Sequence, residues 1–178
     1  LGGADLDEVA ACAEAMADLA DRLGAQPSLR ARGGPALSGG PDATLLERSG
    51  ISGRSNPLAP PLHLAVDDEG GTTRAWAVWT DAYEGPPGCL HGGFVAAAFD
   101  DLMGVAQMAS GNAGFTGTLT VRMRRPTPLH ERIDYEAGVE SAEGRKITVW
   151  GKSWAGDALL AEATILFIAP RGGVLGVR

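Results

Sequence analysis

The feature of this chain that most restricts its fold is the stretch 91–109, which is rich in alanine and apolar on most sides of a helix. Its large apolar side chains are Phe94, Val95, Phe99, Leu102, Met103 and Val105. A helix on a protein surface carries apolar residues on one stripe only, so this pattern is typical of a buried helix. Other elements must therefore cover it on several sides.

Segments with the composition of β-strands flank this helix. Two precede it, at 62–68 and 72–80, and four follow it, at about 115–124, 132–141, 144–155 and 159–169. Proline or glycine marks the turns between the last four strands, as at Pro126, Gly144 and Gly156. This order predicts an α+β fold in which an antiparallel sheet wraps around one long buried helix.

The first 60 residues have a different character. Apolar residues recur at steps of three and four over 4–24, which predicts an N-terminal helix. Residues 25–61 are rich in glycine, proline and serine without a sustained period, which indicates a linker. We therefore expect three parts: an N-terminal helix with its Gly/Pro-rich linker at 1–60, the main domain at 61–170, and a tail at 171–178.

Charge and composition narrow the range of partners. A formal net charge of −7 argues against nucleic acid, and no apolar run is long enough to span a membrane. Cys12 and Cys89 form neither a disulfide framework nor a zinc pattern, so a cytoplasmic location is expected. Residues 122–152 nevertheless hold seven cations against five acids. A basic strip on an acidic protein favours a small phosphorylated ligand.

The start of the buried helix, His91-Gly92-Gly93, is suited to holding a developing negative charge. The first backbone amides of a helix have no partner within the helix, and residues without side chains let a ligand approach them. The helix dipole also favours negative charge at this end. Such a donor to a carbonyl oxygen that becomes an oxyanion is worth roughly 100- to 1000-fold in rate.

Asp100 follows in the same helix, nine residues after His91. In a regular helix it is rotated about 180° from His91 and lies about 13 Å further along the axis. One substrate atom cannot contact both Gly92 and Asp100 of a single helix. If both groups act on one substrate, they come from two chains, which predicts a dimer with a site at each end of the interface.

Two segments resemble a known family. Residues 83–104, YEGPPGCLHGGFVAAAFDDLMG, are similar to the His-Gly-Gly and Asp motif of the phenylacetate-type (PaaI-like) hotdog thioesterases, in the 4-hydroxybenzoyl-CoA thioesterase superfamily. Residues 116–129, TGTLTVRMRRPTPL, resemble the strand that follows in that family. The resemblance covers about 60–170. It implies a hotdog fold, cofactor-free hydrolysis of an acyl-CoA to the free acid and CoA, and a homodimer or a dimer of dimers.

The resemblance also implies site residues. The amide of Gly92, with or without that of Gly93, polarises the thioester carbonyl, and Asp100 either activates water or attacks the carbonyl itself. Thr116 holds the water or the carboxylate in place. His91 acts as a general base or, as is more common, orients the turn and the glycine amides.

One position departs from the family. Some relatives carry Asn or Gln six residues before the His, where this chain has Gly85. That contact to the carbonyl or the water is therefore missing, and the rate or the substrate preference is expected to differ.

The coenzyme is expected to bind to cations. Arg122 and Arg124 share one face of a strand. By resemblance, this pair and the pair Arg145 and Lys146 lie where the CoA phosphates and pantetheine run. Guanidinium groups suit a phosphate dianion. The alternative is that these cations only form a solvated strand face.

Other interpretations of the acidic pair and of Cys89 remain open. Asp100 could pair within a dimer interface, and Asp101 is expected to be structural. No further His or carboxylate shares their face, so no metal is expected. Cys89 opposite His91 lacks the other parts of a cysteine hydrolase.

Two other functions compete with hydrolysis. The first is a non-catalytic acyl-CoA-binding protein with the same fold. The second is an enoyl-CoA hydratase, because 52–59 reads SGRSNPLA, but Arg54 and Ala59 replace the Asp and the His of that signature. The acyl chain is not readable, although the run Ala96-Ala97-Ala98 leaves room beside the helix.

Overall fold

A computed structural model describes residues 5–26, 49–53, 59–66, 72–109 and 114–171. The chain divides into two compact units, Leu1–Ser38 and Gly39–Arg178. Most of the expected linker, and residues 172–178 of the expected tail, lie outside the described residues. Within the described part of the chain, no helix has the length and hydropathy needed to cross a membrane.

The described residues of the first unit, 5–26, form the helix α1 over Leu6–Gly24, close to the predicted 4–24. The Asp5 carboxylate caps it by accepting a hydrogen bond from the amide of Asp7 at 2.9 Å. Asp7 and Glu8 in its first turn complement the positive end of the helix dipole. None of its residues is buried.

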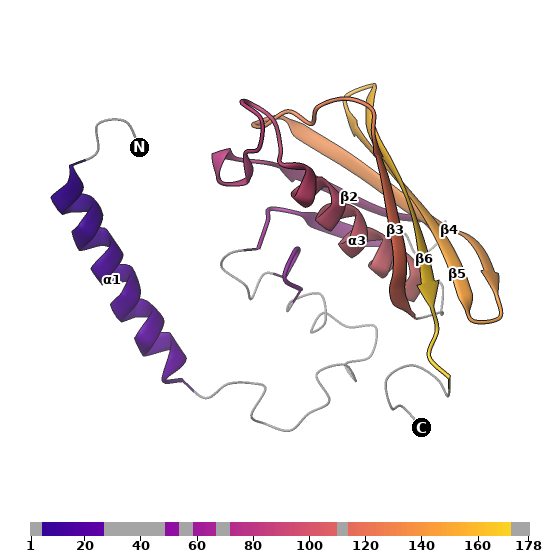
Figure 1. Ribbon diagram of the computed structural model, residues 1–178, viewed down its shortest axis with the longest axis horizontal. Helices are drawn as coiled ribbons and strands as arrows, with labels where there is room; N and C mark the ends of the chain where they lie inside the picture. The colour runs from indigo at the N-terminus through magenta and orange to yellow at the C-terminus, as the bar shows by residue number, and fades with distance from the viewer. Residues whose placement is uncertain (1–4, 27–48, 54–58, 67–71, 110–113, 172–178) are drawn as a thin grey trace. The chain divides into compact units, whose positions relative to one another are not determined.

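The second unit is a six-stranded antiparallel sheet with the helix α3, Gly92–Ala109, against one face (Figure 1). The strand order is β1-β2-β4-β5-β6-β3. The strands are β1 His63–Val66, β2 Thr72–Val78, β3 Phe115–Met123, β4 Arg132–Glu143, β5 Lys146–Ala155 and β6 Ala158–Ile168. A short 3-10 helix, η2, spans Asp81–Tyr83. The predicted α+β hotdog fold is confirmed.

The helix is buried because the inward side chains of the strands pack on it. Alternate residues of β4 and β5 are buried, among them Ile133 and Val149, as the two-residue repeat of a strand requires. On α3, Phe99 and Met103 are fully buried. At Gly151 of β5 a Cβ atom would lie 2.9 Å from both the Met103 Sδ and the Phe99 Cδ1, so a glycine is needed where helix and sheet meet.

A polar pair lies within this core. The indole nitrogen of Trp79 donates a hydrogen bond to the Tyr135 hydroxyl at 2.9 Å. Burial raises the pKa of Tyr135 well above its usual value, and the Trp79 hydrogen bond opposes this only in part. Both side chains are almost completely buried, so their contact fixes the packing of β4 against the end of β2.

Strand β3 is an edge of the sheet and pairs on one side only, with β6. It is nine residues long, and most of its side chains are exposed. Long exposed edge strands offer unpaired backbone groups to another chain. This strand also contacts both the start and the middle of α3, because Met123 lies against Gly92 and Thr116 contacts Asp100.

Candidate active site

The start of α3 is capped by the histidine before it. The His91 Nδ1 accepts a hydrogen bond from the amide of Gly93 at 3.0 Å, and the His91 carbonyl accepts from the amides of Phe94 and Val95 at 2.9 and 3.2 Å. Among the described residues, the amide of Gly92 has no hydrogen-bond partner. The sequence could not show which of the Gly92 and Gly93 amides is available to a ligand. In the structure the Gly93 amide is already bonded to His91, and the Gly92 amide is available.

The loop before the helix explains the departure at Gly85. The amide of His91 donates to the Tyr83 carbonyl at 2.9 Å, which holds the loop against the helix start. A Cβ atom at position 85 would lie 2.7 Å from the Cα of His91. An Asn or Gln side chain therefore has no room here unless the backbone shifts, so the glycine is part of how this loop packs.

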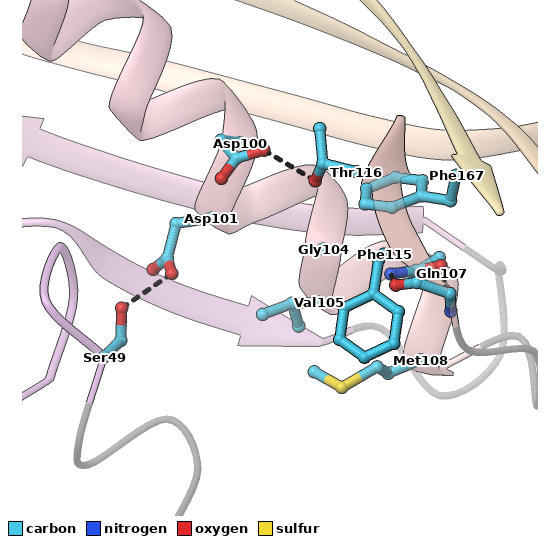
Figure 2. Close-up of a pocket in the computed structure, with 11 residues that line it drawn as sticks. Ser49, Asp100, Asp101, Gly104, Val105, Gln107, Met108, Phe115, Thr116 and Phe167 are labelled. Atoms are coloured by element: carbon cyan, nitrogen blue, oxygen red, sulfur yellow. Dashed lines mark hydrogen bonds between the residues drawn. The ribbon is translucent and has the colours of Figure 1, made fainter. Parts of the chain in front are cut away.

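Asp100 is exposed and lies beside Thr116, the second residue of β3 (Figure 2). The Thr116 hydroxyl donates a hydrogen bond to the Asp100 Oδ1 at 3.0 Å. This leaves the second carboxylate oxygen without a protein donor among the described residues. A carboxylate held by one oxygen, with the other open, can accept a proton or attack a carbon atom.

Asp101 is held by a different partner. Its Oδ1 accepts a hydrogen bond from the Ser49 hydroxyl at 2.7 Å, and Ser49 in turn accepts from the amides of Ile51 and Ser52 (Figure 2). Asp101 therefore anchors the short segment 49–53 to α3. Ser49 could not be predicted as a partner of Asp101, because no local pattern in the Gly/Pro-rich stretch distinguishes one serine from another.

Three of the predicted catalytic residues divide between two separate cavities, and His91 and Gly93 line neither of them. A cavity of about 360 Å³ contains Asp100 and Thr116, and another of about 300 Å³ contains Gly92, Met123 and Arg125. No lining residue is common to both. Eight residues of regular helix separate Gly92 from Asp100, which is about 12 Å along the axis.

The four cations predicted to bind CoA also divide between two places. Arg122 is exposed on β3 opposite Glu162, while Lys146 lies opposite Ile168 at the far end of β6. Arg124 forms an ion pair with Glu162. The Arg145 guanidinium donates to the Ala169 carbonyl at 2.6 Å. One chain alone does not gather these groups.

Neither alternative chemistry gains support from the geometry. Among the described residues, no three His, Cys, Asp or Glu side chains are grouped to hold a metal ion. The backbone of Cys89 pairs with that of Pro128, and its thiol is half-buried. Arg54 of the hydratase-like segment lies outside the described residues.

Comparison with known proteins identifies relatives of this chain, although no family model matches it. Over 87 residues, 48% of this chain, it is 37% identical to acyl-coenzyme A thioesterase THEM4 of Xenopus laevis. The match covers 39% of that protein, so this chain spans well under half the length of the curated relatives that it matches.

Solved structures extend the likeness to almost the whole chain. A crystal structure of a thioesterase superfamily protein is 31% identical with a TM-score of 0.73, over 94% of this chain and 84% of the other. A phenylacetic acid degradation-related protein of Ralstonia eutropha JMP134 is 27% identical with a TM-score of 0.55, over 61% of this chain and 84% of its own.

A more distant structure shares the fold alone. The Streptococcus mutans protein solved with bound acetyl-CoA is 16% identical, with a TM-score of 0.56 over 61% of this chain and 88% of that one. The closer matches carry the assignment, because one of them covers both the helix with its Gly-Gly start and the sheet around it. This chain therefore belongs to the hotdog-fold thioesterase superfamily, and it is similar to a phenylacetic acid degradation-related member of it.

Proposed function

We propose that this protein hydrolyses acyl-CoA thioesters to a free acid and CoA. The observation that carries the proposal is the pair of Asp100 and Thr116 at one cavity, combined with the open amide of Gly92 at another. The matched relatives named as acyl-CoA thioesterases, and the acetyl-CoA bound by a protein of the same fold, support this substrate class.

Two copies of the chain build each site in this proposal. Antiparallel pairing of β3 with the β3 of a second copy, centred near Leu119, sets the Thr116 end of one strand beside the Met123 end of the other. Because Thr116 contacts Asp100 and Met123 contacts the region of Gly92, the two halves of the site then meet. The exposed edge of β3 supports this pairing. A dimer of dimers is compatible with it.

The reaction follows from these groups. The amide of Gly92 donates a hydrogen bond to the thioester oxygen and stabilises the negative charge that develops there. Asp100 of the other copy either takes a proton from water, which attacks the carbonyl carbon, or attacks that carbon itself to give an anhydride that water then cleaves. The carbon–sulfur bond breaks, the sulfur leaves as the thiolate of CoA, and the acid is released.

Two residues support this chemistry without contacting the reacting atoms. Thr116 is a positioning residue, because its hydroxyl fixes one oxygen of Asp100. His91 is also a positioning residue. Its Nδ1 accepts the hydrogen bond of the Gly93 amide, so it orients the start of the helix and does not serve as a base.

In the same proposal, the CoA phosphates bind to the exposed cations. Arg122 and Lys146 lie on exposed strand positions, and Arg145 is exposed although its Nε is engaged. Arg124 contributes less, because Glu162 already neutralises much of its charge. Pairing of two chains at β3 brings the Arg122 end of one copy to the Lys146 end of the other.

Thiol release from acyl-CoA substrates tests the proposal. Asp100→Asn keeps the shape of the side chain but cannot act as a base or a nucleophile, so kcat falls about 100- to 10,000-fold. The neighbouring substitution Asp101→Asn is the matched control, and it should retain most of the activity. Turnover by neither the wild type nor the variant, despite tight binding of acyl-CoA, favours the non-catalytic binding protein. Equal turnover by both excludes Asp100 as the reacting group.

A further inference from the structure

The cavity at Asp100 continues along α3 beyond the carboxylate. Asp100, Gly104 and Met108 follow one another at four-residue intervals, so they form one row along the same face of the helix. All three line the cavity of about 360 Å³. The row spans about 12 Å from Asp100 to Met108.

The far end of this cavity is mainly apolar, and the polar side chain there, Gln107, is engaged with the Gly114 backbone. Val105, Met108 and Phe115 lie together there, away from the hydrogen bond between Asp100 and Thr116 (Figure 2). Met108 is 38% exposed and Phe115 is 58% exposed, which is unusual for large apolar side chains beside a buried helix. An apolar surface that remains open next to a reactive carboxylate suits the tail of a substrate.

Gly104 lies between the two ends and has no structural reason to be a glycine within this chain. A Cβ atom at position 104 would meet nothing within 4 Å. Its φ is negative and helical, so no side chain is excluded by the backbone. Glycine within a helix is nevertheless less favourable than alanine. Gly151 is the contrast, because there a Cβ atom would strike the packed core.

We infer that Gly104 is a specificity-determining residue, which keeps a channel open for an apolar acyl chain of medium length between Asp100 and the end formed by Met108 and Phe115. This inference rests on the proposed function and adds its substrate class. The space beside the helix is lined by Gly104, and not by the run Ala96-Ala97-Ala98, of which Ala98 is fully buried.

A larger residue at position 104 tests the inference. The Leu side chain of Gly104→Leu would occupy the channel about 6 Å beyond Asp100, which leaves room for a short acyl group but not for a longer one. Each methylene that loses its burial weakens binding roughly fourfold. The ratio of kcat/KM for octanoyl-CoA to that for acetyl-CoA should therefore fall at least about tenfold, and Gly104→Ala should lower it less.

A change at the far end gives the opposite result. Met108→Ala lengthens the channel, so the ratio of kcat/KM for dodecanoyl-CoA to that for octanoyl-CoA should rise. The thermal midpoint of each variant, and its oligomeric state, are measured beside the kinetics. An unchanged ratio in Gly104→Leu overturns the inference, and so does loss of the wild-type assembly in that variant, since the glycine would then serve contact between subunits.

Measurements of binding affinity test the acyl channel independently of whether the protein hydrolyses its ligand. The affinities of octanoyl-CoA and acetyl-CoA are measured by calorimetry for Asp100→Asn and for the same variant with Gly104→Leu. Selective loss of octanoyl-CoA binding supports the channel even if the wild type hydrolyses nothing. Equal affinities in the two proteins contradict it even if the wild type is an active thioesterase.

Discussion

Asp100 and Asp101 are adjacent carboxylates that the fold puts to different uses. Asp100 is exposed and receives one hydrogen bond from Thr116, while Asp101 is half-buried and receives one from Ser49. The helix rotates successive side chains by about 100°, so neighbours in sequence face different surroundings. The role of each aspartate therefore depends on the side of the helix on which it lies, since the two residues are chemically identical.

The role of the Thr116 hydroxyl can be tested with two substitutions. Thr116→Val removes the donor to Asp100 but keeps the branched shape, and a hydrogen bond to a charged group contributes about 1.5–3 kcal/mol. We expect kcat to fall about 10- to 100-fold, with a smaller change in KM. Thr116→Ser restores the hydroxyl and should recover most of kcat. Equal kcat in the Val and Ser variants contradicts a positioning role.

Tyr135 gives the molecule a predictable response to high pH. Because burial raises the pKa of its hydroxyl, the folded protein keeps the phenol proton where the unfolded chain has lost it. The contribution of this group to stability is therefore complete below about pH 10, the ordinary tyrosine pKa, and decreases as the pH rises above that value.

Denaturant unfolding of Tyr135→Phe at several pH values measures this effect. At neutral pH the variant leaves the Trp79 indole without its acceptor, so the free energy of unfolding should fall by about 1–3 kcal/mol. Above about pH 10 the difference from wild type should shrink, since the variant has no proton to lose there. A difference that is constant with pH, or that grows, contradicts the assignment.

At the scale of elements, the sequence predicted the helices and strands that local residue patterns determine. The limits of α1, α3 and the strands fall within a few residues of the predicted ranges, because each has a local pattern of apolar residues. Burial accounts for this pattern in α3, β4 and β5, whereas no residue of α1 is buried. The 3-10 helix η2 and the contact of Ser49 with Asp101 were not predicted. Both depend on distant segments, so no local pattern marks them.

The turns between the last strands were recognised by their glycines, and the structure gives the reason. Gly144 and Gly156 have φ values of +58° and +54°, the left-handed region in which a Cβ atom is unfavourable. Neither has an atom within 4 Å of an added Cβ, so strain in the backbone is the whole cost of substitution.

The left-handed conformation of Gly156 predicts the order in which two substitutions there destabilise the protein. Gly156→Ala should lower the free energy of unfolding by about 1–2 kcal/mol, because alanine must adopt the left-handed conformation. Gly156→Asn should cost less, since Asn tolerates that region. Urea denaturation of the three proteins checks the order. Destabilisation by Asn as large as that by Ala would show that strain is not the cause.

At the scale of the whole molecule, the proposed function needs two chains to complete each site. Helix geometry predicted that Gly92 and Asp100 cannot serve one substrate within a chain, and the structure places them in separate cavities. Which of the two glycine amides is open could not be predicted, because it depends on the rotamer of His91. The proposed acyl channel could not be predicted from the sequence either, because residues of both α3 and β3 line it.

The shared site predicts that two inactive variants restore each other. Gly92→Pro removes the amide hydrogen and adds a ring whose Cβ would lie 3.2 Å from the flexible end of Met123, so Gly92→Ala, which adds the same Cβ but keeps the amide, is its control. Proline is well tolerated as the first residue of a helix. Asp100→Asn removes the carboxylate. Each variant alone should be nearly inactive, because every site in its dimer lacks one group.

Refolding the two variants together and measuring thiol release from acyl-CoA is the most direct test. Random pairing makes half of the dimers mixed, each with one intact site, so the mixture should regain about a quarter of the wild-type activity. No recovery in a mixture shown by mass spectrometry to contain mixed dimers would contradict the account, as would full wild-type activity in a protein that remains monomeric.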